Sequence, residues 1–293
     1  MTAVNTESDL ILGNDTSTSP PARNGLSTPG DLTGSDDVAL FVPGLEPHSA
    51  IMAFSLRTGG YSPRPFDTLN FSVGQGDSAE NVRRNFERLG SRLGLDPRRV
   101  VTCRQVHGDR IAVIEDLPDT PPVADAVVTE TPNLYPAIKT ADCLPMLLID
   151  LRLRVSAAVH CGWRGAVHRI SRKVLALLRD RFRTDPTDLI AVLGPAIGAC
   201  CYEVDDAVLT PFRQSVPEPE RFISHGKTAN PGRQSLRLDL AGVNRAELIS
   251  EGVPEENIHQ VEGCTCCDSS RFFSYRRDGA RSGRHIAVVG FKN

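Results

Sequence analysis

The chain has 293 residues, 40% of them hydrophobic, and a formal net charge of −3. This length and apolar content allow a substantial buried core, in one large domain or two small ones, and a globular enzyme is the first expectation. The charge balance excludes the strongly basic surface of a nucleic-acid-binding protein, and no apolar run approaches the ~20 residues of a membrane span. A secretory signal is not recognisable either, so we expect a soluble, cytoplasmic protein.

Residues 1–45 differ in composition from the rest of the chain. They are rich in Ser, Thr, Asp, Gly and Pro, nearly lack aromatic residues, and contain six acids against the single base Arg23. Such a segment cannot bury enough apolar area to offset the loss of chain entropy on ordering. We therefore predict a disordered tail over 1–45, followed by a single catalytic domain over 46–293.

From about residue 50, strand-like runs alternate with a few helical patterns. The predicted strands are 51–58, 99–108, 110–115, 145–150, 154–160, 188–194 and 285–291, and the predicted helices are 79–94, 166–183 and 239–251. In the third helix, Asp239 is a plausible N-cap and Gly252 a plausible stop. Many strands with few helices indicate an α+β, or mixed α/β, single domain.

Three strand ends carry residues that bind borderline metals: His107 in RQVHGD, Cys143 in KTADCLP and His160 in AVHCGWRG. One thiolate and two imidazoles suit zinc, and three protein ligands leave a fourth position for water or substrate, as in catalytic zinc sites. The three residues are far apart in sequence, so only the fold could assemble such a site. A buried cysteine and two histidines bonded to backbone would give the same pattern.

The remaining cysteines have several explanations. Cys200 and Cys201 follow a Gly-Pro turn and are interpreted as packed thiols. The group Cys264, Cys266 and Cys267 could bind metal or be oxidised, but no second CxxC accompanies it, which disfavours a zinc ribbon. Cys103 and Cys161 lie beside the candidate ligands and could line a pocket.

Arginines in glycine-containing loops are the other recurring feature. Arg57 lies in SLRTGGYS, and Arg276, Arg277 and Arg284 lie in FFSYRRDGARSGRH. Guanidinium groups bind phosphate or carboxylate in a bidentate manner. Arg57 and Arg276, which lie beside aromatic residues, are the candidate anion ligands.

Taken together, the motifs resemble the YfiH-type family, also known as laccase-domain or "multicopper polyphenol oxidase" proteins. The resemblance rests on SLRTGGYS, the Leu69–Asn70 pair, ENVRRN, RQVHGD, KTADCLP, AVHCGWRG, LGPAIGACCYEV, LRLDL, and GCTCC through FFSYRRDGARSGR. It implies a CNF/YfiH-like layered sandwich of mixed β-sheets flanked by helices. It also implies metal binding by His107, Cys143 and His160, and it adds Asn70 to the candidate substrate ligands.

The activities that the resemblance implies do not agree with one another. They are phosphorolysis of adenosine, inosine or methylthioadenosine, adenosine deamination, phenol oxidation, and a role in the fidelity of peptidoglycan precursors. A four-copper oxidase needs more histidines, largely in His-x-His pairs, than the seven in this chain, which has no such pair. Copper bound at the zinc site could still support weak phenol oxidation.

The expected function is therefore that of a zinc-dependent purine nucleoside phosphorylase with adenosine deaminase activity, acting on a purine nucleoside and inorganic phosphate. Asp142 is the nearest carboxylate for proton transfer in deamination, or else the partner of a histidine N–H. An amidohydrolase with Cys143 as nucleophile, or a zinc-dependent one, is the alternative enzyme class. A metal-carrying binding protein is the alternative without catalysis. Trp163 is predicted to pack.

Overall fold

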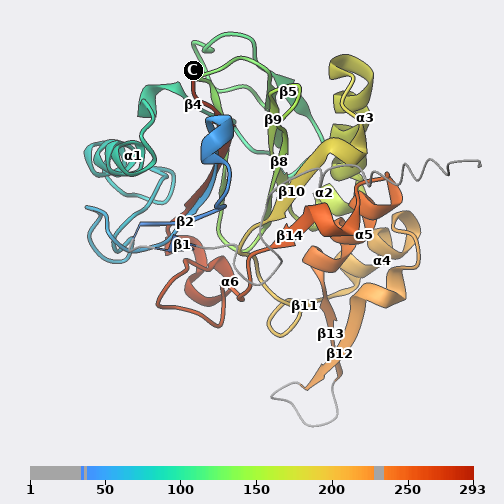
Figure 1. The fold of residues 1–293 in the computed structure, drawn as a ribbon. Helices are drawn as coiled ribbons and strands as arrows, with labels where there is room; N and C mark the ends of the chain where they lie inside the picture. The colour runs from blue at the N-terminus through green and yellow to red at the C-terminus, as the bar shows by residue number, and fades with distance from the viewer. Residues whose placement is uncertain (1–33, 36–37, 228–233) are drawn as a thin grey trace, which may run out of the picture.

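The computed structural model of the protein describes residues 34–35, 38–227 and 234–293. Two six-stranded sheets lie face to face at its centre, and helices cover the outer faces of both sheets (Figure 1). The predicted mixed α/β sandwich is therefore confirmed. Among the described residues, no helix is both long and apolar enough to cross a lipid bilayer.

The first sheet has the strand order β1-β2-β3-β15-β7-β4. Its strands are β1 (Gly34–Ser35), β2 (Ala39–Phe41), β3 (Ala50–Ser55), β15 (His285–Phe291), β7 (Tyr135–Thr140) and β4 (Val100–Thr102). β15 pairs antiparallel with both β3 and β7, whereas β4 runs parallel to β7. A strand from the end of the described chain thus lies in the middle of this sheet.

The second sheet has the order β14-β10-β8-β9-β6-β5. Its strands are β14 (Ile258–Gln260), β10 (Leu189–Leu193), β8 (Leu144–Asp150), β9 (Val155–Cys161), β6 (Ala126–Thr129) and β5 (Ile111–Val113). β8 and β9 form its antiparallel centre, and β14 runs parallel to β10. The chain passes from the first sheet to the second between β7 and β8, in the segment that contains Cys143.

Side chains alternate along the central strands and so divide the core into layers. Along β8, Leu147 and Ile149 belong to the apolar layer between the two sheets, whereas Met146 and Leu148 pack toward the helices outside the second sheet. This burial on both faces explains why the run PMLLID is apolar at nearly every position.

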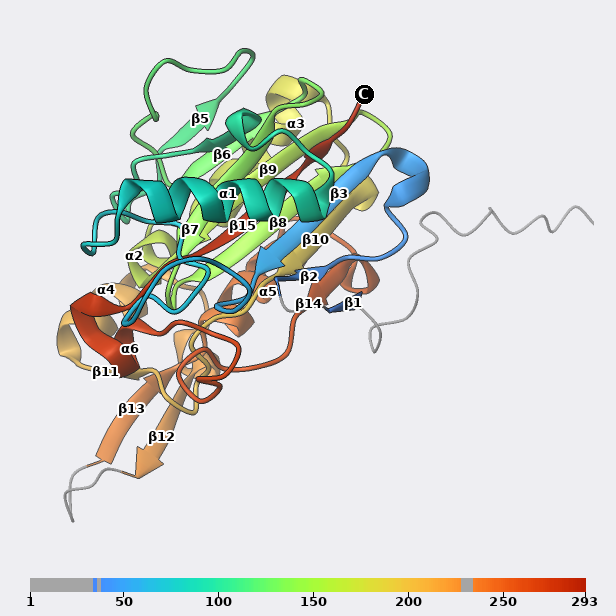
Figure 2. The ribbon, with the colours of Figure 1, turned by 90° about the vertical axis from the view of Figure 1, so that its left-hand side faces the viewer.

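Helices close the two outer faces of the sandwich. α1 (Ala79–Leu93) covers the first sheet through Leu89 and Leu93 and lies across its strands in Figure 2. α3 (Ile170–Phe182) and α5 (Leu240–Ser250) cover the second sheet. The order of layers is therefore helix, sheet, sheet, helix.

A smaller cluster joins the short helix α2 (Trp163–Val167), α4 (Asp206–Ser215) and α5 beside a third sheet. That sheet has the order β11-β13-β12, with β11 (Glu203–Val204), β12 (Ile223–Lys227) and β13 (Gln234–Leu238), and it projects from the lower end of the molecule (Figure 2). α6 (Tyr275–Asp278) lies near the same end.

Short 3₁₀ helices connect other elements: η1 (Glu46–His48), η2 (Pro97–Arg99), η3 (Pro186–Asp188), η4 (Pro219–Phe222), η5 (Glu255–Asn257) and η6 (Gly279–Arg281).

Two of the three predicted helices match the structure closely. The side chain of Ser78 caps α1, which stops at Gly94 in the left-handed conformation, and Asp239 caps α5 as predicted. The predicted helix 166–183 is instead two helices, α2 and α3, because Arg169 adopts a left-handed conformation (φ 56°) and bonds Glu247 of α5. β6, β7, α4 and the antiparallel pair of β12 and β13 were not predicted from the sequence.

The predicted tail over 1–45 needs a correction at its end. Most of it lies outside the described residues, but β2 pairs with β3, and Val38, Leu40 and Val42 are buried. Leu40 and Val42 belong to the core between the two sheets and Val38 to the core under α1, so the folded domain begins before the predicted boundary at 46.

Candidate metal centre and active cavity

The three predicted metal ligands meet at one end of the sandwich. His107 follows β4, Cys143 lies between β7 and β8, and His160 lies near the end of β9. Their ligand atoms all lie within 4.8 Å of one another, and the two imidazole rings are in edge contact with centroids 4.9 Å apart. Both sheets thus contribute to this set of three side chains, named here the His-Cys-His group, which the sequence analysis could infer only as a possibility.

Asp125 fixes both histidines. One carboxylate oxygen accepts from Nδ1 of His160 (2.8 Å) and from the backbone N–H of His107 (2.9 Å), and the other accepts from Gly108 N–H (2.8 Å). Burial opposes ionisation of Asp125, but these hydrogen bonds, led by that of His160, lower its pKa to about 2. Since Nδ1 of His160 is engaged, Nε2 is the atom left for a metal.

Without a metal, Cys143 and His160 of the His-Cys-His group carry opposite charges. Burial acts to raise the pKa of the Cys143 thiol, but His160 and hydrogen bonds from both imidazoles lower it to about 6. Burial acts to lower the pKa of His160, whereas Cys143 and Asp125 raise it to about 9. In the metal-free protein a thiolate therefore faces an imidazolium. Release of the imidazolium proton would leave one thiolate and two neutral imidazoles, a donor set that suits a divalent cation.

Glycine at position 162 allows this arrangement. A Cβ at Gly162 would lie 3.1 Å from Sγ of Cys143 and 3.7 Å from the ring of His107. Gly162 is also the N-cap of α2, so the chain turns from β9 into α2 close to the sulfur atom. The Gly-Trp-Arg-Gly turn thus makes room for the candidate metal ligands.

Asp142 lies in the lining of the cavity beside Cys143, but it is not the partner of a histidine N–H, which was one of the two roles expected for it. Its Oδ1 accepts from the hydroxyl of Thr265 (2.6 Å), its Oδ2 accepts from the backbone N–H of Arg276 (2.6 Å), and its backbone is in a left-handed conformation (φ 91°). The partner of the histidine N–H is Asp125. Asp142 instead holds the loop that carries Arg276 beside Cys143.

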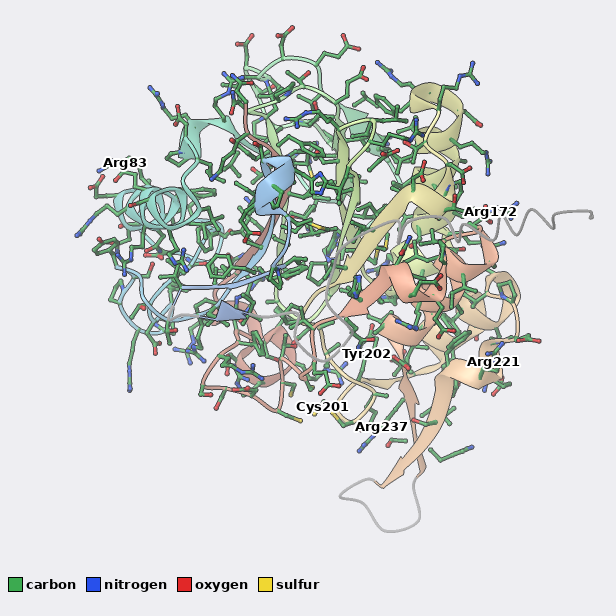
Figure 3. All side chains as sticks on the ribbon, viewed as in Figure 1. Arg83, Arg172, Cys201, Tyr202, Arg221 and Arg237 are labelled. Atoms are coloured by element: carbon green, nitrogen blue, oxygen red, sulfur yellow. The ribbon has the colours of Figure 1, made fainter. Side chains whose placement is uncertain are left out.

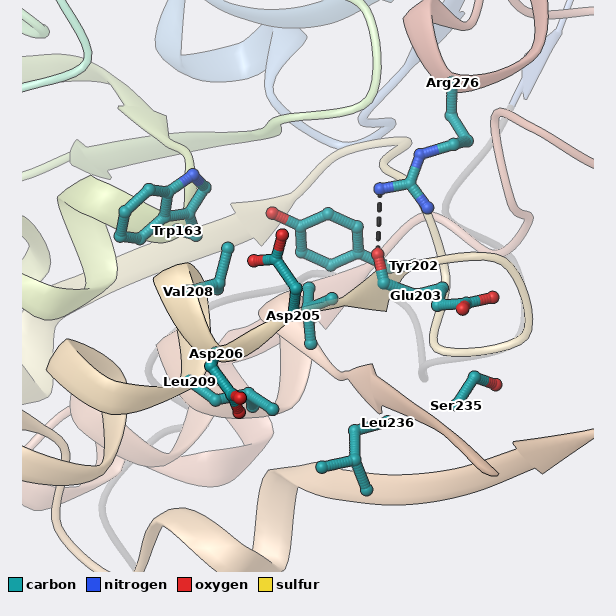
Figure 4. Close-up of a pocket in the computed structure, with 11 residues that line it drawn as sticks. Trp163, Tyr202, Glu203, Asp205, Asp206, Val208, Leu209, Ser235, Leu236 and Arg276 are labelled. Atoms are coloured by element: carbon teal, nitrogen blue, oxygen red, sulfur yellow. Dashed lines mark hydrogen bonds between the residues drawn. The ribbon is translucent and has the colours of Figure 1, made fainter. Parts of the chain in front are cut away.

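A cavity of about 850 Å³ opens above the His-Cys-His group. His107, Cys143 and His160 lie in its lining with the aromatic side chains of Tyr202 and Tyr275. A second hollow of about 660 Å³ adjoins it and shares Trp163, Tyr202 and Arg276 with it (Figure 4). Trp163 packs into the cluster around α2, as predicted, and also faces both hollows.

The predicted anion ligands are only partly at the cavity. Arg57 is not in its lining: the guanidinium bonds the carbonyl oxygens of Asp67 and Ser269 and stacks on Phe273. Asn70 is buried and holds the backbone of Ser72 and Arg284. Arg276 does line the cavity, but its guanidinium donates to the carbonyl oxygens of Cys201 and Glu203.

Other cations line the cavity that the sequence analysis did not select: the half-buried Lys139 and Arg284 and the exposed Arg104. Burial lowers the pKa of Lys139, opposed by Cys103, and burial also lowers the pKa of Arg284, opposed by Cys143 and Asp142. Among the described residues, no carboxylate forms an ion pair with Lys139 or Arg284. An anion in the cavity would relieve the desolvation of both cations.

Asp125 was also missed, although the sequence held a signal for it. It stands alone in the apolar run VADAVV, and a lone buried carboxylate requires several hydrogen-bond donors. Lys139 similarly follows the apolar residues of β7. A single charged residue within or beside an apolar run is the signal that would have pointed to both.

The remaining cysteines divide into two groups. Cys103 lines the cavity, and burial, together with Asp125, raises its pKa to about 12. Cys161 is fully buried, and burial raises its pKa as well. Cys200 and Cys201, which were predicted to pack in the core, are instead exposed and half-buried and lie beside Cys264 and Cys267.

Known proteins resemble this chain over most of its length. The family model described as "Multi-copper polyphenol oxidoreductase laccase" matches residues 51–292. The purine nucleoside phosphorylase YlmD of Geobacillus stearothermophilus is 34% identical over 82% of this chain and 90% of that protein. The adenosine deaminase RL5 of an unknown prokaryotic organism is 33% identical over 86% of this chain and 96% of that protein.

The solved structures agree with the fold. The crystal structure of the Bacillus licheniformis hypothetical protein YfiH matches with a TM-score of 0.81 and 31% sequence identity, and the match covers 88% of this chain and 98% of that chain.

Proposed function

Because the chain belongs to the multi-copper polyphenol oxidoreductase laccase family, the YfiH-type proteins, we propose that it is a zinc-dependent purine nucleoside phosphorylase that also deaminates adenosine. Relatives that carry each of these two names support the pairing of activities. The substrates are then a purine nucleoside and inorganic phosphate.

One observation carries the proposal: the His-Cys-His group and two half-buried cations line the same cavity. Phosphorolysis requires a site for the phosphate dianion next to C1′ of the ribose, and Lys139 and Arg284 supply positive charge there. A cavity of about 850 Å³ is within the usual range for small-molecule sites. The aromatic rings of Tyr202 and Tyr275 offer surfaces for the purine.

The donor atoms that the described residues offer are suited to a zinc ion. His107, Cys143 and His160 would hold it, and Asp125 would orient His160. When bound, zinc supplies Lewis-acid catalysis and activation of water near neutral pH. Lys139 and Arg284 would bind and orient the phosphate, and Asp142 would keep the loop of Arg276 against the cavity.

The laccase description of the family fits the described residues less well. The seven histidines of the chain are dispersed, and among the described residues only His107 and His160 lie in a group that could bind a metal. This is too few for a four-copper cluster. Copper in place of zinc at the same three ligands would account for a weak phenol oxidation.

The test is chromatography of adenosine incubated with the purified protein, with and without inorganic phosphate. Adenine that forms only with phosphate establishes phosphorolysis, and inosine in both samples establishes deamination. Unchanged adenosine, inosine and methylthioadenosine would contradict the proposal and would direct the search to amide substrates.

The Cys143→Ala variant should lose the bound metal and both activities, because two imidazoles alone hold zinc weakly. Metal content and turnover are measured on the same sample. Cys161→Ala is the matched control, since Cys161 is buried at the end of β9, next to His160, but is not a member of the His-Cys-His group. Full activity in Cys143→Ala would refute the assignment of the site.

A further inference from the structure

A second group of cysteines lies outside the His-Cys-His group. The Sγ atoms of Cys200, Cys201, Cys264 and Cys267 all lie within 4.8 Å of one another. Sγ of Cys267 is 3.3 Å from that of Cys201 and 3.6 Å from that of Cys200. We propose that these four residues, named here the four-cysteine cluster, bind a structural zinc ion that fixes two loops beside the active cavity.

The fold assembles the four-cysteine cluster from two neighbouring loops. β10 and β14 are parallel neighbours, so the loops that follow them leave the sheet at the same end. A parallel bridge between Ala196 and Cys264 continues this pairing into the loops. The first loop supplies adjacent cysteines, and the second supplies Cys264 and Cys267 in C-x-x-C spacing, which is typical of zinc sites.

The distances match a tetrahedral thiolate site. Four sulfur atoms at about 2.3 Å from a zinc ion are about 3.8 Å from each other. In the four-cysteine cluster two separations are 3.3 and 3.6 Å and none exceeds 4.8 Å. The backbone N–H of Gly198 donates to Sγ of Cys264 at 3.2 Å, as N–H groups do to metal-bound thiolates. A Cβ at Gly198 would lie 3.2 Å from Sγ of Cys200, so the loop is shaped around the sulfur atoms.

Packing and disulfide formation explain the four-cysteine cluster less well. Thiols that serve only as apolar groups are usually buried, but Cys200 and Cys267 are exposed. A single disulfide would involve two of the four and leave the convergence of the others unexplained. Four soft donors with no open position are typical of structural zinc rather than catalytic zinc.

Charges near the four-cysteine cluster suit a zinc tetrathiolate, which carries a net negative charge. Arg237 donates to the carbonyl oxygen of Cys200, Arg276 to that of Cys201, and Arg277 to that of Cys266. Three guanidinium groups therefore lie around the backbone of the two loops. Figure 3 labels Cys201 with Tyr202 and Arg237 close together at the lower end of the sheets.

The four-cysteine cluster is directly connected to the wall of the active cavity. Tyr202, which lines the cavity, follows Cys201, and Thr265, which follows Cys264, donates to Asp142. Arg276 links the first loop to the segment that contains Cys143, because its side chain donates to the carbonyl oxygen of Cys201 and its backbone N–H donates to Asp142. A metal in the four-cysteine cluster would hold this wall in place without contacting substrate.

Metal content of the full chain tests the proposal independently of catalysis. Wild-type protein, desalted and analysed by mass spectrometry for metals, should contain two zinc ions per chain. Cys143→Ser and Cys264→Ser should each retain one, and the Cys143→Ser/Cys264→Ser double variant should contain none. Cys266→Ser, in the same loop but outside the four-cysteine cluster, is the matched control and should retain two.

One zinc ion per wild-type chain that disappears in Cys143→Ser would overturn the proposal, as would iron or copper at the second site. A disulfide among the four cysteines, detected as an unreduced mass lighter by two hydrogen atoms, would also overturn it. X-ray absorption at the zinc edge needs no variant to fold: wild-type protein should show mostly sulfur ligands at about 2.3 Å. A shell dominated by nitrogen and oxygen would contradict the four-cysteine cluster as a zinc site.

Discussion

Asp125 accepts hydrogen bonds from the backbone N–H groups of Val106, His107 and Gly108 and from the ring of His160. A single carboxylate therefore sets the path of one ligand loop and the tautomer of a ligand on another strand. An amide cannot accept all four bonds, and its own N–H2 group would face donors.

Asp125→Asn should weaken zinc binding about 10- to 100-fold and lower the stability of the metal-free protein by about 1–3 kcal/mol. Competition with a chromophoric chelator measures the affinity, and urea denaturation measures the stability. Asp109→Asn changes the same loop at an ion pair with Lys173 near the surface and should have little effect. Equal zinc affinities in the two variants would contradict this role of Asp125.

Substitution of Arg284 and substitution of Arg57 should differ in their effect on the KM for phosphate. Arg284→Gln removes a cation from the cavity and should raise the KM for phosphate about tenfold or more. Arg57→Gln removes bonds to Asp67 and Ser269 away from the cavity, so it should lower stability by about 1–3 kcal/mol and leave the KM for phosphate unchanged. Steady-state kinetics with varied phosphate distinguish the two residues, and the reverse pattern would restore Arg57 as the phosphate ligand.

His285 makes the stability of the protein sensitive to acid. Burial lowers its pKa from 6.5 to about 3, and the neutral Nε2 accepts from the backbone N–H of Phe273. Below about pH 6.5 the unfolded chain takes up a proton that the folded protein does not, so stability falls as the pH decreases from about 6.5 toward 3.

The contribution of His285 to this loss is about 2 kcal/mol between about pH 7 and pH 5. His285→Gln keeps an acceptor for Phe273 but cannot be protonated, so it should remove that part of the loss. Denaturation in urea at the two pH values measures it, with the exposed His48→Gln as control. An unchanged pH dependence in His285→Gln would show that the ring is not held neutral.

The residue types of the candidate metal site could be predicted from the sequence, but their partners could not. His107, Cys143 and His160 are recognisable as soft or borderline ligands at strand ends. Asp142 was placed beside the histidines because it is adjacent to Cys143 in sequence, whereas the left-handed backbone at Asp142 directs its carboxylate to Thr265 and Arg276. Side-chain direction at such a position depends on the loop conformation and not on strand alternation.

At the scale of elements, the junction of β9 and α2 brings backbone close to the candidate metal ligands. Gly162→Ala would place a Cβ 3.1 Å from Sγ of Cys143, so the sulfur atom would have to move by a few tenths of an ångström. We expect weaker zinc binding and lower turnover in a protein that still folds. Zinc titration and thermal unfolding of the same variant measure the two effects.

Gly108→Ala is the matched control for this change. It follows the candidate ligand His107, and a Cβ there would be 3.6 Å from the carboxylate of Asp125, an ordinary contact. It should bind zinc like the wild type. If both variants kept full affinity, the close approach at Gly162 would not matter for the site.

Hydrophobic periodicity predicted the helices α1 and α5 better than the segment 166–183. The bounds of α1 and α5 were predicted closely, and the N-cap of α5 is the predicted Asp239. The segment 166–183 carries one helical pattern, but the pattern contains no sign of the left-handed turn at Arg169, which is set by packing against α5. The four-cysteine cluster was missed for a related reason: Cys201 and Cys267 are 66 positions apart in the sequence and meet only through the pairing of β10 with β14.

At the scale of the whole molecule, many strands with few helices predicted a mixed α/β domain, whereas the layered sandwich was implied only by the family resemblance. The order of strands within each sheet was not predictable, because partners such as β3 and β15 are far apart in sequence and their alternation patterns fit several registers. The boundary of the tail was set too late because β2 is only three residues long, too short for a periodic signal.

The central position of β15 has a consequence for biosynthesis. β3 and β7 both form their ladders with β15, yet β3 leaves the ribosome more than two hundred residues earlier. Until residue 291 has emerged, the first sheet is divided in two, with an unsatisfied strand edge on each half. Native pairing of these strands must therefore follow translation of nearly all the described chain, and until then both edges are open to pairing with other strands.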